Sequence, residues 1–277
     1  MLKPLLLKIY GVYAALAFVV VVLLLFCPLL IAAPTLRIRR TIGRITVRAW
    51  LAAIFVPLRV RGLDHLPQTP CVVLCNHASY VDGIVLTAAL PENFTFLVQH
   101  EARQWPYVGL IIRRMGVAFV NRHAVMPAAL ALRRLIRAID TGESVAIFPE
   151  GSFRKPPGLM HFYGGAFVIA AKTGVPVVPA VMRGTRRILS DGEILPRPGR
   201  IDIKLFAPIR AAGKQRRDAE RLGNEARRVM LEHCGEIDGE AMRHAGHAGH
   251  DCIENPIDGV YRDIGLHVTG SPVDAKE

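Results

Sequence analysis

His77 and Asp82 stand five residues apart, directly after the apolar run Cys71–Cys75. We expect residues 79–90 to form a helix, which places the Asp82 carboxylate in the first turn, within reach of the imidazole. General-base catalysis needs one imidazole nitrogen that faces the substrate and a second that an acceptor holds. No enzyme nucleophile is evident in the segment, so the pair predicts activation of a substrate hydroxyl. The alternative is a strand-end histidine beside an aspartate that favours a helix N-terminus.

The N-terminal part of the chain is long and apolar enough to enter a membrane. From Ile9 to Leu36 there are 28 residues without a charge, and a hydrocarbon core of about 30 Å needs roughly 20. A cleaved signal peptide fits less well, because the apolar region is too long and Pro28 interrupts the usual cleavage site. A second apolar run, Ala49–Val56, follows. The sequence therefore predicts a membrane anchor, either a full span or a helical hairpin that dips into one leaflet.

Basic residues flank this anchor unequally. Two lysines precede it and four arginines follow it closely: Lys3, Lys8, Arg37, Arg39, Arg40 and Arg44. Because positive charge marks the cytoplasmic flank of a membrane segment, we expect a protein of the cell inner membrane with its main domain on the cytoplasmic side.

The net charge of +12 is uneven along the chain: residues 236–277 carry nine acidic and three basic residues, a net −6, which leaves +18 for the rest. A basic body beside a membrane anchor indicates attraction to anionic lipid headgroups or phosphorylated substrates. Nucleic acid is not an expected partner, because no recognition motif accompanies the charge and aromatic residues are only 7%. The five cysteines lack metal-site spacing, which is typical of a reducing compartment.

Short apolar runs alternate with helical segments after residue 60. The expected strands are Cys71–Cys75, Phe94–Val98, Val117–Val120, Ser144–Phe148, Val175–Val181 and Ile201–Phe206. The expected helices are Tyr80–Leu90, Tyr107–Met115, Pro127–Asp140, Gly165–Thr173 and residues 215–234. This alternation predicts an α/β fold with a mixed, mostly parallel sheet flanked by helices. We divide the chain into an anchor (1–60), an α/β domain (61–235) and an acidic, histidine-containing tail (236–277).

Three further segments end in residues that suit a binding site. Gly116–Arg122 ends in a cation, and Phe148–Ser152 holds a carboxylate and a flexible glycine. Val175–Pro179 is bracketed by prolines, which predicts an edge strand or a shaped groove. Because sites in such sheets gather at the carboxyl ends of strands, these groups are expected to share one cleft with His77.

Taken in order with His77 and Asp82, these segments resemble the four motif blocks of the glycerophospholipid acyltransferases, the family of 1-acyl-glycerol-3-phosphate acyltransferases. The resemblance runs from about Leu63 to Ile209. It implies transfer of a fatty acyl group from acyl-CoA or acyl carrier protein to a lysophospholipid hydroxyl. His77 would then take the proton of the acceptor hydroxyl, and Asp82 would hold the imidazole tautomer and stabilise its positive charge. No acyl-enzyme is needed.

The resemblance assigns substrate binding to nine residues of the other three blocks: Gly116, Phe119, Arg122, Glu150, Gly151, Ser152, Arg154, Pro176 and Pro179. In that assignment Arg122 binds the acceptor phosphate through its planar guanidinium. The block at Glu150 shapes the acceptor pocket, and the prolines line the acyl-donor side. The alternative for Arg122 is a surface ion pair with Glu150, and for the prolines it is mere strand termini.

Three cationic positions of the family pattern are altered in this chain. The common Glu-Gly-Thr-Arg appears here as Glu-Gly-Ser-Phe-Arg, with Phe153 in the place of the arginine and Arg154 displaced by one residue. Gln99 stands where a lysine is frequent, and Tyr163 replaces the lysine of Phe-Lys-x-Gly. The dyad is intact, so these changes bear on the acceptor headgroup and not on the chemistry.

The sequence leaves three functions open. The first is synthesis of phosphatidic acid from lysophosphatidic acid. The second is acylation of another lysolipid, such as a lyso-amino-acid lipid or a lysophosphodiester. The third is a non-catalytic lipid-binding membrane protein, which the intact dyad disfavours. No bound cofactor is expected, and the histidines at 244, 247 and 250 favour a polar tail over a metal site.

Overall fold

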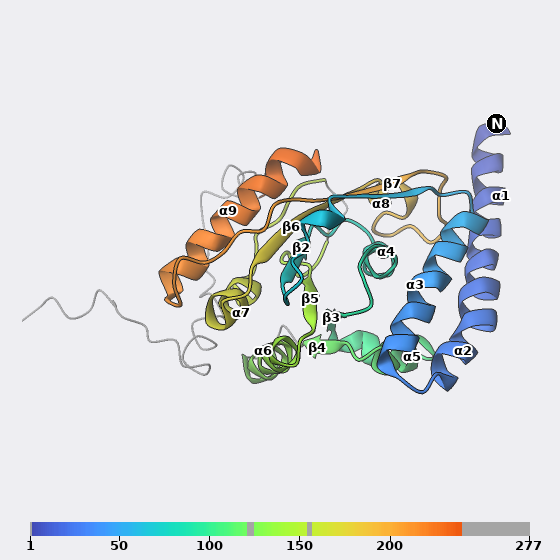
Figure 1. Cartoon of the computed structure of the whole chain (residues 1–277). Coiled ribbons are helices and arrows are strands. Elements are labelled where there is room, and N and C mark those ends of the chain that lie inside the picture. Colours follow the sequence, from blue (N-terminus) through green and yellow to red (C-terminus); the bar gives the residue numbers. More distant parts are fainter. Residues whose placement is uncertain (1, 121–124, 154–156, 240–277) are drawn as a thin grey trace, which may run out of the picture.

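The computed structural model describes residues 2–120, 125–153 and 157–239. Arg122 and Arg154, two of the expected binding residues, lie outside the described residues. So does almost all of the predicted tail, with its histidines. The family-matched part of the chain is otherwise in view (Figure 1).

In the described part of the chain, seven strands form one sheet with the order β1-β7-β6-β2-β5-β3-β4. The strands are β1 (Leu58–Arg61), β2 (Val72–Cys75), β3 (Phe94–Gln99), β4 (Ala118–Val120), β5 (Ser144–Ile147), β6 (Val177–Arg183) and β7 (Ile201–Leu205). All neighbouring pairs are parallel except β6 and β7. This arrangement confirms the predicted mixed, mostly parallel sheet, and it places the carboxyl ends of β2, β5 and β6 at the same edge.

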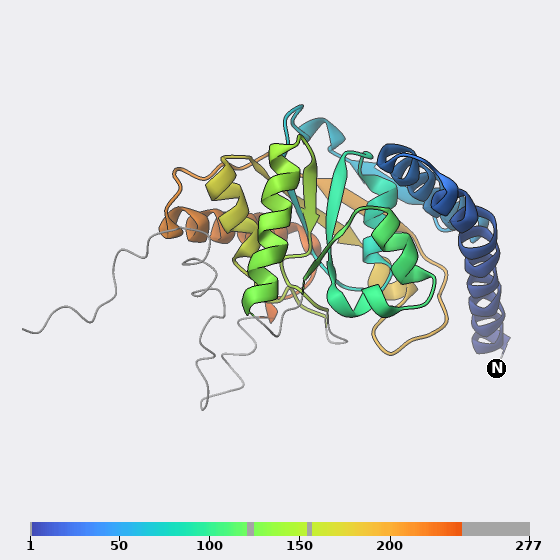
Figure 2. The ribbon, with the colours of Figure 1, turned by 90° about the horizontal axis from the view of Figure 1, so that it is seen from below.

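Helices cover both faces of the sheet (Figures 1 and 2). They are α1 (Leu2–Ala17), α2 (Cys27–Ala32), α3 (Leu36–Ala53), α4 (Asp82–Ala89), α5 (Val108–Arg114), α6 (Val125–Asp140), α7 (Gly165–Thr173), α8 (Thr185–Ile188) and α9 (Arg216–Cys234), with a π-helical segment η1 (Phe18–Phe26) and short 3₁₀ turns η2 (Leu63–His65) and η3 (His100–Gln104). One core cluster joins the sheet to α6, α7 and α9, and a second joins it to α3 and α4. The central β2 is buried on both faces, which explains its uninterrupted apolar run.

Two features of the sheet differ from the sequence predictions. The first is β1, which was not expected: its residues alternate between half-buried and exposed at the edge beside β7, so no apolar run marks it. The second is the position of the proline-bracketed strand. The prediction of an edge was wrong, because β6 pairs with both β2 and β7. The Pro179 carbonyl accepts a hydrogen bond from the Phe206 amide, one residue beyond the end of β7. Pro179 therefore lies where the hydrogen-bond ladder between β6 and β7 has ended, and there the proline does not need an N–H group.

The N-terminal segment forms a helical hairpin. Helices α1, η1 and α2 follow one another without a break, and α3 returns beside them after a turn at residues 33–35, where the Thr35 hydroxyl caps α3 by accepting from the Ile38 amide. The Tyr10 hydroxyl donates to the Ile54 carbonyl at 2.8 Å, and the Phe18 and Trp50 rings pack edge to face at 5.3 Å. Within the described residues, one helix, Lys3–Ala32, is long and apolar enough to cross a membrane.

Buried Arg40 holds this hairpin to the sheet. Its guanidinium, on a side chain only 6% exposed, donates to the Met115 carbonyl (3.1 Å), the Glu92 carbonyl (3.2 Å), the Thr95 hydroxyl (2.6 Å) and the Glu143 carboxylate (2.8 Å). Thr95 and Glu143 lie at the amino ends of β3 and β5. The hairpin is therefore attached at the edge of the sheet opposite to the carboxyl ends of those strands.

Replacement of Arg40 by alanine should lower the free energy of unfolding by about 3 kcal/mol, because it leaves a carboxylate and two carbonyls without their partner. Chemical denaturation of the detergent-solubilised protein measures the change. Arg37→Ala is the control: Arg37 is 82% exposed and its ion pair with Glu92 is 3.3 Å long, so its removal should cost less than about 1 kcal/mol. Equal effects of the two substitutions would contradict a special role for Arg40.

Candidate active site

The segment after β2 turns sharply and leads into α4, and this turn carries His77. Asn76, the first residue of the turn, is 3% exposed. Its side-chain amide donates to the Met182 carbonyl at 3.0 Å, and its side-chain oxygen accepts from the Met182 amide at 2.7 Å. The turn is thereby fixed to the carboxyl end of β6, the neighbour of β2 in the sheet.

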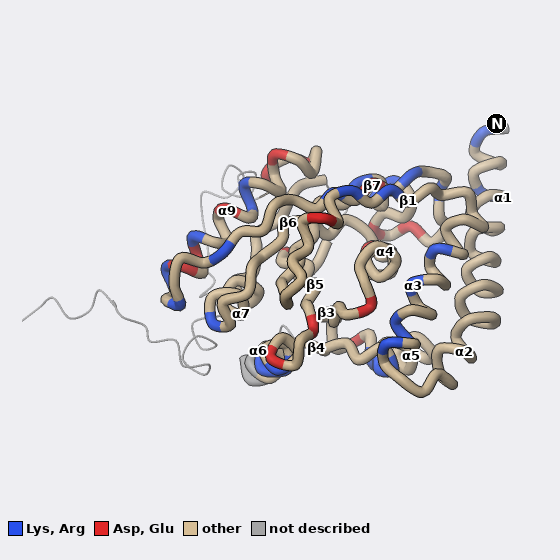
Figure 3. Tube along the Cα trace, viewed as in Figure 1, with Lys and Arg blue, Asp and Glu red and all other residues tan. Residues whose placement is uncertain are grey.

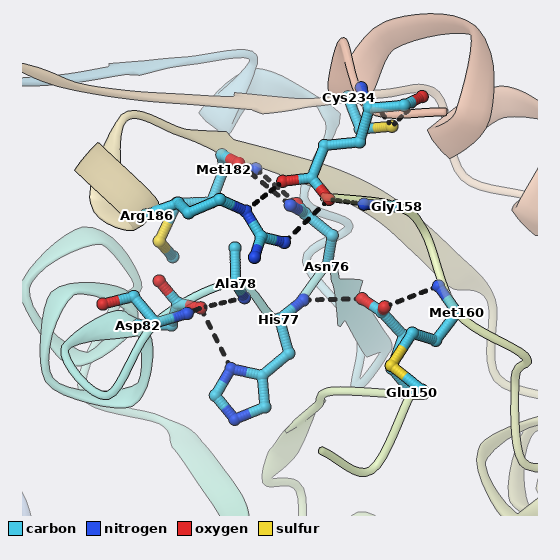
Figure 4. A network of polar contacts seen from close by, with 12 residues as sticks. Asn76, His77, Ala78, Asp82, Glu150, Gly158, Met160, Met182, Arg186 and Cys234 are labelled. Carbon is cyan, nitrogen blue, oxygen red and sulfur yellow. Dashed lines mark hydrogen bonds and ion pairs between the residues drawn. The ribbon is translucent and has the colours of Figure 1, made fainter. Parts of the chain in front are cut away.

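His77 and Asp82 form the expected pair (Figure 4). The distance from His77 Nδ1 to Asp82 Oδ2 is 2.9 Å, and Oδ2 also accepts the amides of Ala78 at 2.6 Å and Ser79 at 2.8 Å. Two donated N–H groups already identify Oδ2 as an acceptor, so the proton shared with the imidazole belongs to Nδ1. Asp82 is fully buried, whereas His77 is 18% exposed. This leaves Nε2 with a free lone pair, as a general base requires.

Aromatic side chains form walls around the imidazole. The His77 ring stacks on Phe148 with centroids 4.4 Å apart and planes inclined by 19°. Phe153 lies on it at 4.7 Å, and Tyr80 meets Phe153 edge to face at the same distance. Two aromatic rings, those of Phe148 and Phe153, therefore contact the imidazole directly. Phe153, one of the departures from the family pattern, is therefore in direct contact with the catalytic candidate.

Glu150 fixes the backbone of His77 from the other side of the turn. Its side chain is 3% exposed. Oε1 accepts the His77 amide and Oε2 accepts the Met160 amide, both at 2.7 Å. Burial raises the pKa of this carboxyl to about 7, although the two amide hydrogen bonds act in the opposite direction. Glu150 is thus a positioning group for His77.

The structure brings some of the other expected residues to the dyad and leaves others apart. Gly151 (φ 69°) and exposed Ser152 follow Glu150 directly. Gly116 and half-buried Phe119 belong to the region of β4, three strands away from β2 in the sheet order.

The two prolines of the fourth block lie along β6. Pro179 pairs with Leu74 inside the sheet. The Pro176 carbonyl accepts the Val72 amide at 2.9 Å, at the amino end of β2, which is opposite to the end that carries His77. Pro176 is therefore not part of the cluster around the dyad.

An ion pair that the sequence did not indicate completes the cluster. Arg186 and Glu236 form a bidentate pair with two contacts of 2.9 Å, and Glu236 Oε2 also accepts the Gly158 amide at 2.8 Å. The two residues are 50 positions apart, and Glu236 had been assigned to the polar tail. Asn76 was missed as well, although it precedes His77 directly. Within the described residues, no group of three or more His, Cys, Asp and Glu side chains is placed to hold a metal ion.

Comparisons with known proteins identify similar sequences. Residues 57–183 match the family model described as Acyltransferase. A chloroplastic 1-acyl-sn-glycerol-3-phosphate acyltransferase of Brassica napus is 33% identical over 71% of this chain, which spans 57% of that protein's length. A lyso-ornithine lipid O-acyltransferase of Pseudomonas aeruginosa is 29% identical, with 66% of this chain and 77% of that protein covered.

The fold is similar to a solved structure. The crystal structure of the 1-acyl-sn-glycerophosphate acyltransferase of Thermotoga maritima superposes with a TM-score of 0.65 and 22% identity, over 83% of this chain and 96% of that one. A mostly parallel sheet flanked by helices is thus shared with that protein.

Ionisation of Glu150 should make stability depend on pH. The pKa of Glu150 in the folded protein, about 7, lies above the ordinary 4.5 that applies to the unfolded chain. The protonated carboxyl therefore stabilises the fold fully below about pH 4.5, and this stabilisation is lost as the pH rises through about 7. Between about pH 5 and 8 the free energy of unfolding should fall by up to about 3 kcal/mol relative to Glu150→Gln. Denaturation of both proteins across this range measures the difference, and a difference independent of pH would contradict it.

Proposed function

The chain belongs to the acyltransferase family, and on that premise we propose that it moves a fatty acyl group from a thioester donor to a hydroxyl of a lysolipid. The observation that carries the proposal is the 2.9 Å contact between His77 Nδ1 and the buried, three-fold hydrogen-bonded Oδ2 of Asp82. The contact orients the imidazole, while its partial exposure leaves Nε2 accessible to a substrate. Such an arrangement suits a base that deprotonates an incoming hydroxyl.

The chemical step follows from these positions. His77 Nε2 takes the proton of the acceptor hydroxyl as its oxygen attacks the thioester carbonyl carbon, forming a C–O bond and a tetrahedral oxyanion. When the oxyanion collapses, the C–S bond breaks, and the leaving thiolate takes the proton from the imidazolium. Asp82 holds the required tautomer and stabilises the imidazolium while it exists. The acyl group passes directly to the acceptor.

The surroundings of Ser79 support direct transfer. Ser79 supplies the hydroxyl nearest to His77 in sequence, but it is fully buried. Its Oγ donates to the Leu189 carbonyl and accepts the Val81 amide at 3.3 Å. A hydroxyl engaged in this way serves the turn and is not placed to attack a substrate. The nucleophile therefore comes from the acceptor.

The acceptor we propose first is 1-acyl-glycerol-3-phosphate, acylated at its sn-2 hydroxyl to give phosphatidic acid, with acyl-CoA or acyl carrier protein as donor. The Brassica napus relative carries that activity in its name. The phosphate would be bound by Arg122 and Arg154. No bound cofactor takes part in this mechanism.

A specific observation favours a second acceptor class. Phe153 occupies the place of the family's usual arginine and packs on His77 at 4.7 Å. An aromatic ring in that position offers no ionic partner to a terminal phosphate. The Pseudomonas aeruginosa relative is named for a lyso-ornithine lipid. A lyso-amino-acid lipid or a lysophosphodiester is therefore the second candidate.

The substrates of either reaction would come from the cell inner membrane, with the catalytic domain on its cytoplasmic side. The hairpin exposes many large apolar side chains, among them Leu5, Leu6, Ile9, Val12, Leu16, Leu24, Leu25 and Leu29. Arginines, drawn in blue in Figure 3, recur along α3 of the same hairpin. Apolar insertion together with attraction of anionic headgroups is the usual basis of such binding.

His77→Ala should lower acyl transfer by about 10²–10⁴-fold, because the general base is lost. Asp82→Asn should also lower the rate of acyl transfer. Product formation by detergent-solubilised protein measures both. His65→Ala is the matched control, since His65 contacts the carbonyl of Leu205 on β7, which is two strands away from β2, and it should keep parental activity. Near-parental turnover by His77→Ala would overturn the mechanism. Absence of turnover with every acceptor, in the parent too, would favour the non-catalytic lipid-binding protein.

Competition between lysophosphatidic acid and a lyso-ornithine lipid in the same micelles tests the acceptor. We expect the parent to prefer lysophosphatidic acid. Phe153→Arg, which restores the family's commoner residue, should raise that preference about tenfold, the value of one charge-assisted hydrogen bond. A parental preference for the lyso-ornithine lipid would instead support the second candidate, and Phe153→Arg should then weaken it.

A further inference from the structure

A cavity of about 440 Å³ adjoins the turn that carries the dyad. Its walls come from the carboxyl end of β6, from α8 and from the residues that end α9: Ala78, Met182, Arg183, Gly184, Thr185, Arg186, Arg187, Cys234, Gly235 and Glu236. The volume lies within the range of ligand sites, about 300–1,000 Å³. Apart from Ala78, which lies between His77 and Asp82, none of these residues belongs to the four motif blocks that carry the family resemblance.

The lining of the cavity is basic. Three arginines face a single carboxylate, that of Glu236, so the lining groups sum to +2. Glu236 is already neutralised by Arg186 and the Gly158 amide. The Arg187 guanidinium is exposed and makes no ion pair or hydrogen bond with the described residues. Arg183 donates to the His233 carbonyl, which leaves further N–H groups on its guanidinium. The available charge is therefore positive and suits an anion.

A buried hydroxyl in the same wall lacks a partner. Thr185 is 1% exposed, and its Oγ1 makes no hydrogen bond with the described residues. Leaving a buried hydroxyl unsatisfied costs roughly 1–3 kcal/mol. The backbone before it is confined: Gly184 has φ 97°, and a Cβ there would lie 2.0 Å from the Arg200 carbonyl oxygen. Thr185 lines the cavity, so an acceptor oxygen of a bound ligand is a candidate partner for this donor.

The cavity and the dyad share a wall. Ala78 lines the cavity, and its amide donates to Asp82 Oδ2 at 2.6 Å. Met182, a second lining residue, is bound twice to Asn76, the residue before His77. A ligand in the cavity therefore rests against the loop that orients the base. Figure 4 shows Arg186 across the turn from the imidazole.

We propose that this cavity binds a phosphate ester carried by one of the two substrates, through Arg187, Arg183 and the Thr185 hydroxyl. The proposal rests on the proposed function for the identity of the substrates. Each substrate carries a phosphate ester. In the donor it belongs to the phosphopantetheine arm, which CoA and acyl carrier protein share, and in the acceptor it belongs to the headgroup of the lysophospholipid.

Equilibrium binding without turnover tests the cavity. One arm compares 4′-phosphopantetheine with pantetheine, and the other compares lysophosphatidic acid with monoacylglycerol in the same micelles. The parent should prefer the phosphorylated member of one pair, and Arg187→Ala should reduce that preference at least tenfold. The pair of ligands whose preference is reduced shows whether the donor or the acceptor supplies the phosphate. Arg200→Ala is the matched control, because Arg200 is 75% exposed and pairs with Asp202 outside the cavity; it should change nothing.

Thr185→Val separates binding from folding. It removes the unpartnered hydroxyl and keeps the side-chain shape, so affinity for the phosphorylated ligand should fall severalfold while the thermal midpoint does not decrease. A parent without preference in either arm, or a preference that Arg187→Ala leaves intact, would overturn the proposal. Phosphate-dependent binding by a protein that transfers no acyl group would support the cavity and reject only the proposed function. If Arg187→Ala transfers the acyl group normally and keeps the parental preference for the phosphorylated ligand, the proposed function is supported and the cavity is rejected as the phosphate site.

Discussion

Three hydrogen-bond donors converge on one buried oxygen, Oδ2 of Asp82: the imidazole Nδ1 of His77 and the amides of Ala78 and Ser79. A buried carboxylate is tolerated only when donors compensate for its lost hydration. Here two of the donors are backbone groups of the turn itself. The same contact that makes burial of the charge possible also shapes the turn and sets the imidazole tautomer. The geometry of the site depends on this one atom.

The order of the strands explains how the turn is held on both sides. Because β2 lies between β5 and β6, its carboxyl end has neighbours from two distant parts of the chain. On the β6 side, the backbone amide and carbonyl of Met182 form hydrogen bonds with the side-chain oxygen and the amide group of Asn76. From the segment after β5, Glu150 takes the amide of His77. The hairpin is attached through Arg40 at the amino ends of β3 and β5, and its apolar residues pack together with α4 against one face of the sheet.

The elements could be predicted from the sequence wherever burial alone determines the pattern. Six strands are marked by apolar runs, and each was found within two residues of its expected bounds. The strand β1 has no such run because it is a half-exposed edge. The prolines suggested that β6 is an edge strand. A proline is also tolerated inside a sheet where the hydrogen-bond ladder to the neighbouring strand has ended, and the end of that ladder is set by the neighbour, β7, and not by the sequence of β6. His77 and Asp82 were predicted because they are local; Asn76–Met182 spans 106 residues and leaves no sequence signal.

The electrostatics of the cluster links residues that sequence distance would separate. After burial, the negative charges of Glu236 and Asp82 also raise the pKa of Glu150. Arg186 offsets the charge of Glu236 through two contacts of 2.9 Å. Without that arginine, Glu236 would act on Glu150 uncompensated and favour its protonated form. A protonated carboxyl is a weaker acceptor for the His77 amide than a carboxylate is. The position of the base therefore depends on an ion pair formed more than one hundred residues later in the chain, which is why Arg186 of α8 and Glu236, just after α9, belong to the site.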